Sequence, residues 1–261
     1  NRPARLPAPP ERTMTGKEKM ARAMAMEDLG EIPVMCQLAI GHTLLNTDVS
    51  PLEFNTNSAE YARALLAIRD RYDFDGILIH KPGRDPALRA AFTDIEETDE
   101  GPVAHFADGA SILWTKDDDP KYFYPPGYSL SEIETLEIAH LWDDLPESLR
   151  LWWIHKGLHP WTSPEEIPEF YYDCIDRVLS AVGERYSVHG ETKAPSDFFL
   201  NALGIEPAMI ALILEPEKSH ALMEYFTDCA IAWCVAQVRR GCHAIKISSP
   251  YVGGGFLSRD H

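Results

Sequence analysis

A short apolar run that ends in polar or small residues and is followed by a helix-like segment occurs four times in this chain. The runs are Ile32–Gln37, Phe74–His80, Tyr186–Glu191 and Ala244–Ser249. Buried strands that alternate with long helical patterns are typical of βαβ units, whose strands are parallel. The repeated pattern therefore predicts an α/β fold with a parallel sheet, in which the loops after the strands carry the chemistry.

A (β/α)8 TIM barrel is the expected architecture, with only about the first four β/α units present. Such a barrel needs about 250 residues, but long regions beside the strands leave room for only four strands within these 261 residues. Residues 1–14 are rich in Pro and Arg and are expected to form an extended arm, followed by a barrel domain over 15–261. Because four strands leave an open edge and half a core, we expect a longer natural polypeptide or a second chain that completes the barrel.

Helical segments are predicted between the strands from apolar periodicity and from capping residues. They cover residues 16–27, 58–72, 129–142, 163–186, 194–204, 206–214 and 217–240. Residues 95–128 are expected to be an insertion that contains a hairpin, because Val103–Phe106 and Ala110–Thr115 are separated by the turn signal Ala107–Asp108–Gly109.

The composition disfavours nucleic acid as a partner, because 41 acidic residues outweigh 24 basic ones and give a net charge of −17. Most of such a surface would repel a polyanion, and no cluster of lysine and arginine offers an exception. The five cysteines are odd in number, which argues against a disulfide framework and fits a reducing cytoplasm. No apolar stretch of about 18 residues is present, so no association with a membrane is expected.

The stretch from His189 to His261 resembles the uroporphyrinogen decarboxylase superfamily through the order and spacing of several short motifs. The resemblance extends weakly through the first two predicted strands and implies a (β/α)8 barrel. The superfamily has two main groups, which are uroporphyrinogen decarboxylase itself and the corrinoid-linked methyltransferases.

Two departures from the decarboxylase pattern favour the methyltransferase group. The decarboxylase carries a first-strand loop like PVWFMRQAGRYL, in which two arginines bind carboxylates. Aligned on Pro33–Leu44 (PVMCQLAIGHTL), these arginines fall on Leu38 and His42, so the bidentate carboxylate donors are lost. The aspartate that ends the decarboxylase's second strand falls near Pro82, and Asp85 could replace it only with a shifted loop.

The resemblance to the methyltransferase group implies that a methyl group moves between a corrinoid (methylcobalamin) protein and a small-molecule acceptor, a thiol or a tetrahydropterin. It also implies zinc, which binds and deprotonates the thiol. The zinc ligands of that group follow the fourth strand, so they are expected outside this chain segment. The adjacent Cys242 and His243 precede a strand, at the wrong end of a barrel, and are expected to serve packing. A homodimer is also expected from the resemblance.

Three residues at predicted strand ends are the candidate catalytic residues. His42 and His80 could donate to an anion or transfer a proton, and each is otherwise a structural loop histidine. Glu191 could act as acid or base, or cap the helix that begins near Ala194. Lys81 follows His80 and offers positive charge to a phosphate or carboxylate, unless it is only solvated.

Further candidates could bind the ligand or cofactor. Gly190 permits close approach of a ligand to the backbone, and Asn201 stands where the resemblance places a tyrosine of the decarboxylase pocket. Ser248 and Ser249 end the fourth run, and Gly253 begins a triple glycine that either cradles a ligand or forms a flexible turn.

Three functions remain open at this point. The first is corrinoid-dependent methyl transfer, with His42, His80 and Glu191 around the barrel mouth. The second is a carboxy-lyase that acts on a tetrapyrrole or related acid, which needs cationic residues in the pocket. The third is a non-catalytic binding protein on the same scaffold.

Overall fold

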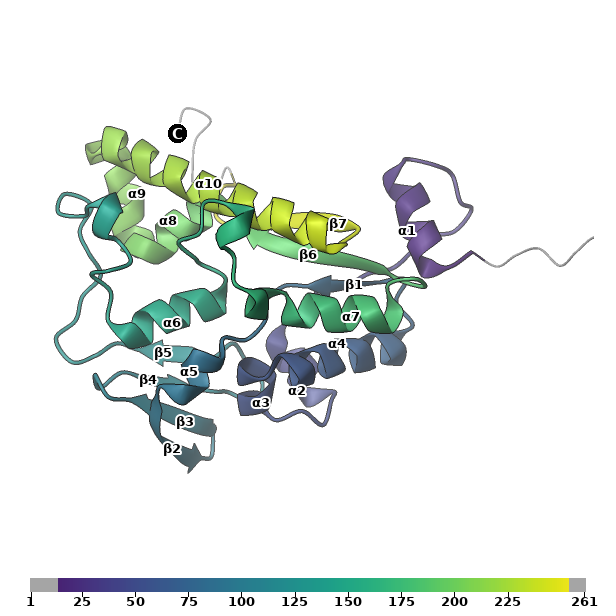
Figure 1. Cartoon of the computed structure of the whole chain (residues 1–261), viewed down its shortest axis with the longest axis horizontal. Coiled ribbons are helices and arrows are strands. Elements are labelled where there is room, and N and C mark those ends of the chain that lie inside the picture. The colour runs from purple at the N-terminus through teal and green to yellow at the C-terminus, as the bar shows by residue number, and fades with distance from the viewer. Residues whose placement is uncertain (1–13, 254–261) are drawn as a thin grey trace, which may run out of the picture.

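A three-stranded parallel sheet lies at the centre of the computed structural model, which describes residues 14–253 (Figure 1). Its strands are β1 (Gly76–Ile79), β6 (Ser187–Lys193) and β7 (Ala244–Ser248), in the order β1-β6-β7. Gly76 pairs with Ser187, and His189 pairs with Ala244, both in parallel register. The α/β class and the parallel sheet predicted from the apolar runs are therefore confirmed.

A helix precedes each strand of this sheet. These helices are α4 (Ser58–Tyr72), α7 (Asp173–Val182) and α10 (Pro216–Arg240). Helices α4 and α7 lie side by side along β1, and α10 lies against β6 and β7 (Figure 1). The core between them contains fully buried Phe54, Tyr61, Tyr171 and Val188. Because the three strands pair in parallel, their carboxyl ends lie at one edge of the sheet.

The predicted first strand, Ile32–Gln37, is wrong. This segment is an exposed loop in which the Val34 carbonyl accepts one hydrogen bond, 2.7 Å long, from the Asp75 backbone N–H. Pro33 has no N–H to donate to a ladder, and Ile32 is 88% exposed. The described residues thus form three parallel strands instead of four and do not form a closed barrel.

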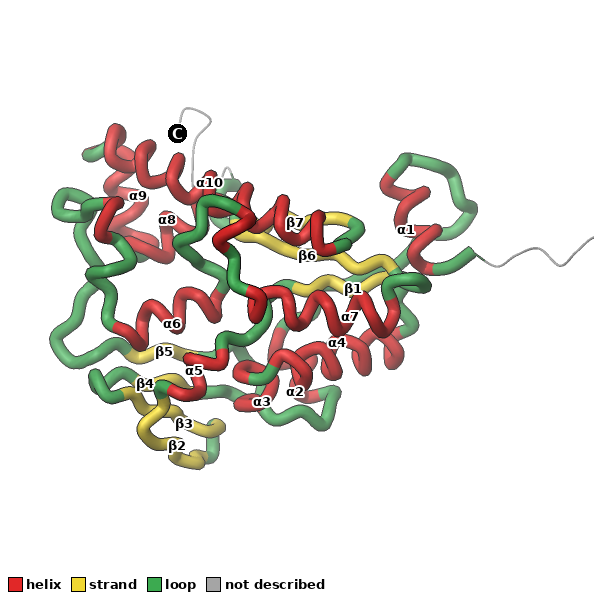
Figure 2. The backbone as a smooth tube through the Cα atoms, viewed as in Figure 1, coloured by secondary structure: helices red, strands yellow, loops and turns green. Residues whose placement is uncertain are grey.

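The region expected to be an insertion forms a second, antiparallel sheet (Figure 2). Its strands are β2 (Phe92–Thr98), β3 (Gly101–Phe106), β4 (Ser111–Leu113) and β5 (Lys121–Phe123). The predicted hairpin is β3–β4, in which Ala104 pairs with Ile112. Fully buried Trp114 anchors this sheet through an edge-on contact with His155, at 5.5 Å between ring centroids.

Shorter helices complete the described chain. They are α1 (Gly16–Met24), α2 (Ile40–Leu45), α3 (Pro51–Thr56), α5 (Pro86–Ala90), α6 (Glu147–Lys156), α8 (Pro195–Leu203) and α9 (Ile205–Leu214). The predicted capping box of α1 is confirmed, because Thr15 Oγ1 accepts from the Glu18 N–H while the Glu18 carboxylate accepts from the Thr15 N–H.

One predicted helix is wrong, and a second is confirmed only in part. Residues 129–142 contain only a 3₁₀ turn, Ile138–His140. Ile133, Leu136 and Leu141 are nevertheless buried, in a cluster that also contains Phe198 of α8 and Phe226 of α10. Residues 163–186 divide into two 3₁₀ turns, Pro164–Glu166 and Glu169–Tyr172, and the later helix α7. Pro168 separates the two turns, since it cannot donate a helical hydrogen bond.

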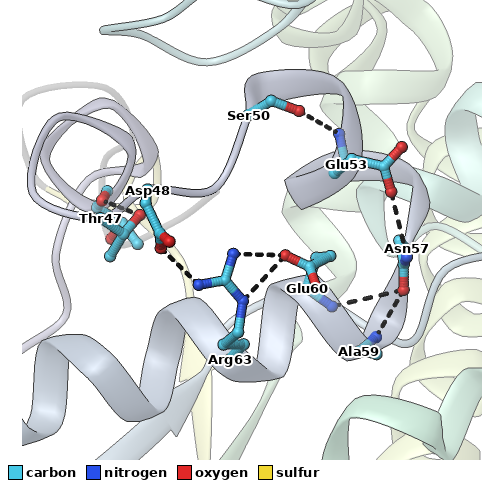
Figure 3. A network of polar contacts seen from close by, with 9 residues as sticks. Thr47, Asp48, Ser50, Glu53, Asn57, Ala59, Glu60 and Arg63 are labelled. Atoms are coloured by element: carbon cyan, nitrogen blue, oxygen red, sulfur yellow. Dashed lines mark hydrogen bonds and ion pairs between the residues drawn. The ribbon is translucent and has the colours of Figure 1, made fainter.

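Polar caps hold the junction between α3 and α4 (Figure 3). Ser50 Oγ accepts from the Glu53 N–H at 3.3 Å, and Asn57 Oδ1 accepts from the Ala59 N–H at 3.0 Å. Arg63 then bridges Glu60 and Asp48. These contacts set where α4 begins, and hence where it presents Tyr61 to the end of β1.

No helix within residues 14–253 is by itself both long enough and apolar enough to cross a membrane. Helices α8 and α9, which meet at a bend of 108°, meet this length and composition criterion only as a pair.

Candidate active site

A cavity of about 370 Å³ lies at the carboxyl ends of β1, β6 and β7. His80 and Lys81 enter it from the end of β1, Glu191 and Lys193 from β6, and Ser248 from β7. In parallel α/β sheets this edge is where ligands bind, because the loops after the strands converge there. The cavity has the volume of a small-molecule site.

The structure brings together only part of the predicted site. His80, Glu191, Asn201 and Ser248 line the cavity. His42, Gly190, Ser249 and Gly253 do not line it. His42 lies on α2, where its Nε2 forms a 2.8 Å hydrogen bond with the Tyr72 hydroxyl. Ser249 Oγ instead forms a 3.3 Å hydrogen bond with Ser196 Oγ.

Tyr61 of α4 sets the tautomer of His80. The Tyr61 hydroxyl accepts from the Lys81 backbone N–H at 3.2 Å and lies 3.4 Å from His80 Nδ1. A hydroxyl that accepts from an amide keeps its own proton to donate, so we assign the His80 tautomer with the proton on Nε2. Burial lowers the pKa of His80 to about 3, and the charges of Lys81 and Arg84 act in the same direction.

The same tautomer leaves an unused donor in the site. His80 Nε2 is buried and has no hydrogen-bond partner among the described residues. At neutral pH this imidazole is uncharged, and its Nε2–H can donate to a bound ligand. His80 is therefore suited to hold an anionic or thiolate group but not to remove a proton.

Lysines are concentrated at the cavity although the protein is strongly acidic. Lys156 forms a 3.1 Å ion pair with Asp119, whereas Lys81 and Lys193 form no ion pair within 4.0 Å to any residue in 14–253. Burial lowers the pKa of Lys81 well below its ordinary value, helped by the charges of Lys156 and Lys193. Burial also lowers the pKa of Lys193. A lysine amine with a depressed pKa can serve as a base near neutral pH.

Two carboxylates of the cavity differ in their surroundings. Glu191 lies 3.2 Å from Lys246 Nζ, and its backbone carbonyl accepts from Trp233 Nε1 at 3.1 Å. Asp197, in the first turn of α8, is 4% exposed, and its Oδ2 has no hydrogen-bond partner within residues 14–253. Burial raises the pKa of Asp197. The Glu191 carboxylate is thus paired with Lys246, whereas Asp197 Oδ2 is a hydrogen-bond acceptor without a partner among the described residues.

Gly190 serves helix packing in this structure. A Cβ at this position would overlap the side chain amide of Gln237 on α10, which donates from Nε2 to the Glu191 carbonyl at 3.3 Å. The absence of a side chain at Gly190 therefore lets α10 approach β6, which is a close backbone approach by a helix and not by a ligand.

Replacement of Gly190 by alanine is expected to lower the free energy of unfolding by about 1–3 kcal/mol, because the new methyl group overpacks against Gln237. Urea unfolding would measure the change. The double variant Gly190→Ala, Gln237→Ala is expected to recover part of the loss, since it removes the overlapping amide. A stable Gly190→Ala protein that loses only ligand binding would contradict this packing role.

Several cavity residues were not predicted from the sequence. They are Asp119, Lys156, Lys193 and Asp197. Lys193 could have been found, because it comes two residues after Glu191 at the end of the same strand. Lys156 and Asp119 lie far in the chain from β1, β6 and β7, and no local pattern marks them.

No group of three or more His, Cys, Asp or Glu side chains that could hold a metal ion occurs within residues 14–253. Cys242 and His243 come just before β7, and His243 Nδ1 accepts from the Val188 N–H at 2.9 Å. The donor set expected for zinc therefore does not fit the described part of the chain, and no zinc-dependent step is derived below.

Comparison with known proteins links the end of the chain to a sequence family and most of the chain to a known fold. Residues 155–261 match the family described as uroporphyrinogen decarboxylase (URO-D). A methyltransferase from Methanosarcina mazei has a similar fold, with a TM-score of 0.61 and 17% sequence identity. The match covers 95% of this chain and 63% of the methyltransferase, so the chain spans less than two thirds of that protein. No curated protein sequence matches the chain.

At this level of identity the structural match shows a shared α/β fold, while the family match concerns the segment that carries α7 to β7. That segment contributes Glu191, Lys193 and Asp197 to the cavity. Residues 155–261 are thus similar to the uroporphyrinogen decarboxylase family, as their resemblance in sequence indicated.

Proposed function

We propose that this protein is a methyltransferase that moves a methyl group between a corrinoid (methylcobamide) protein and a thiol or tetrahydropterin acceptor. The observation that carries the proposal is the cavity at the strand ends, where Lys81 and neutral His80 lie together. The fold shared with a methyltransferase supports it. A cavity of about 370 Å³ would hold the acceptor, while the corrinoid would stay on its partner protein and approach the mouth.

Activation of a thiol is the task that these residues can perform. The corrinoid would supply the methyl group as an electrophile. The Lys81 amine, whose pKa burial lowers well below its ordinary value, would accept the thiol proton. The His80 Nε2–H would then donate to the sulfur as it gains negative charge. A carbon–sulfur bond would form while the carbon–cobalt bond breaks, with its electron pair leaving with the corrinoid on the partner protein, and the thiol proton would remain on Lys81.

Zinc remains part of the proposal only as an ion bound by residues outside 14–253. Zinc would lower the pKa of a bound thiol. The roles of Lys81 and His80 do not depend on it.

A carboxy-lyase that acts on a tetrapyrrole or related acid is the second candidate. It is favoured by the unpaired Lys81 and Lys193, because such a reaction needs cationic groups that bind carboxylates. Lysine makes a point contact, in contrast to the bidentate arginine that is absent from the first-strand loop. We therefore rank this function second.

Anaerobic incubation with methylcobalamin and a panel of thiols and a tetrahydropterin would test the first proposal. We expect acceptor-dependent loss of the methylcobalamin absorption bands, faster than in a control without protein. The carboxy-lyase would instead release carbon dioxide from a porphyrinogen acid with no change in methylcobalamin. Absence of both reactions would favour a non-catalytic binding protein.

A further inference from the structure

The charges that line the cavity balance almost completely. Three lysines (81, 156 and 193) and three carboxylates (Asp119, Glu191 and Asp197) face it. Lys156 pairs with Asp119 at 3.1 Å, and Glu191 pairs with Lys246 at 3.2 Å. Burial favours the neutral amine of Lys81. The groups left for a ligand are Lys193 and Asp197. Burial lowers the pKa of Lys193 and raises that of Asp197, but the attraction between the two groups opposes both shifts and favours their charged forms.

Asp197 is the more constrained member of this pair. Its side chain is on a residue that is only 4% exposed, and its Oδ2 lacks a hydrogen-bond partner among residues 14–253. A buried carboxylate oxygen without a partner is costly, so such an oxygen in a cavity usually contacts a donor that arrives with the ligand. Lys193 attracts Asp197 electrostatically but does not donate a hydrogen bond to Oδ2.

We propose that the cavity binds a small zwitterion, whose ammonium group donates to Asp197 Oδ2 while its carboxylate or sulfonate accepts from Lys193 Nζ. A ligand with both charges gives Asp197 and Lys193 each a partner of opposite charge and leaves the cavity neutral. The assignment of this ligand as the methyl acceptor rests on the proposed function. In that case the ligand would be a thiol that carries both groups. Its binding does not require methyl transfer.

A matched series of three thiols would test the proposal by titration calorimetry without methylcobalamin. L-Cysteine carries both charged groups, 3-mercaptopropionate lacks the ammonium, and cysteamine lacks the carboxylate. We expect L-cysteine to bind about tenfold more tightly than either of the others, because each charge-assisted hydrogen bond adds affinity.

Substitution of either cavity residue should weaken binding of L-cysteine, but the two substitutions should differ in their effect on the thiols that carry one charged group. With Asp197→Asn, the affinity for L-cysteine should fall about tenfold, while that for 3-mercaptopropionate should stay equal or rise, since a repelling charge is removed. With Lys193→Met, the affinities for L-cysteine and 3-mercaptopropionate should fall, and that for cysteamine should not. Asp176→Asn, which alters a surface ion pair with Arg240, is the matched control and should change none of them.

Equal affinity for the three thiols would overturn the proposal, as would an Asp197→Asn variant that loses all three ligands alike. The rise or constancy of 3-mercaptopropionate binding in Asp197→Asn also reports that the variant is folded. If L-cysteine binds as expected but methylcobalamin is unchanged in its presence, the zwitterion site stands and the proposed methyl transfer fails.

Discussion

Replacement of Lys81 by methionine is expected to lower kcat/KM for methyl transfer by about 10²–10³-fold, the usual loss when a positioned proton acceptor is removed. Methionine keeps the length and apolar stem of the side chain but has no amine. The affinity for the acceptor should change little, because Lys193 and Asp197 remain. Steady-state kinetics of methylcobalamin demethylation would measure the loss.

The pH profile would connect this loss to proton transfer. Only the unprotonated amine can accept the thiol proton, and burial lowers the pKa of Lys81 well below its ordinary value. In the unmodified protein kcat/KM should therefore rise with pH and level off below the range expected for an exposed lysine. This rise should be absent in Lys81→Met and intact in Lys116→Met, which alters an exposed lysine. A Lys81→Met protein that keeps the same profile would contradict the assigned base.

Replacement of His159 by phenylalanine is expected to make the fold more resistant to acid. His159 is completely buried, stacks on Trp161 at 5.2 Å between ring centroids, and meets Tyr171 and Phe198 edge-on. Neither ring nitrogen forms a hydrogen bond to another described residue. Phenylalanine retains the aromatic contacts and removes the group that takes up a proton.

The expected gain in acid resistance follows from burial, which lowers the pKa of His159 to about 3 from an ordinary value of 6.5. Between these two values the unfolded chain binds the proton and the folded chain does not, so stability falls as the pH falls. For each unit by which the pH is lowered, the free energy of unfolding of His159→Phe should therefore fall by about 1.4 kcal/mol less than that of the unmodified protein. Urea unfolding between pH 6 and pH 4 would measure both slopes.

The matched control for this prediction is His220→Phe, which changes an exposed histidine of α10. It should leave the slope nearly unchanged. His155 is also buried, and burial lowers its pKa well below the ordinary value, so part of the acid sensitivity will remain in His159→Phe. Equal slopes for His159→Phe and the unmodified protein would contradict the prediction.

Local chemistry explains which elements could be predicted. Helix α4 begins at Ser58 as expected, since Asn57 caps it and an apolar stripe follows. The segment Ile32–Gln37 has the same apolar character as a strand, yet Ile32 is 88% exposed. An apolar run indicates a strand only where another element covers it, and that information is not local.

The residues of the candidate site also differ in whether the local sequence predicts them. His80 and Glu191 could be predicted because they end buried strands, and the ends of parallel strands meet at one edge. Their surroundings could not be predicted. Lys156 reaches the cavity from α6 and Asp197 from α8, and the packing of these helices depends on contacts distant in the chain.

The sequence by itself determined the α/β class, the positions of β1, β6 and β7, and the two strand-end residues His80 and Glu191. These features depend on periodicity, caps and strand ends, which are local properties of the chain. Only the tertiary structure decided that His42 lies outside the cavity, that Gly190 packs against α10, and that Lys193 and Asp197 remain unpaired within residues 14–253. The physical reason is that burial and pairing of charges are set by elements that meet only after folding.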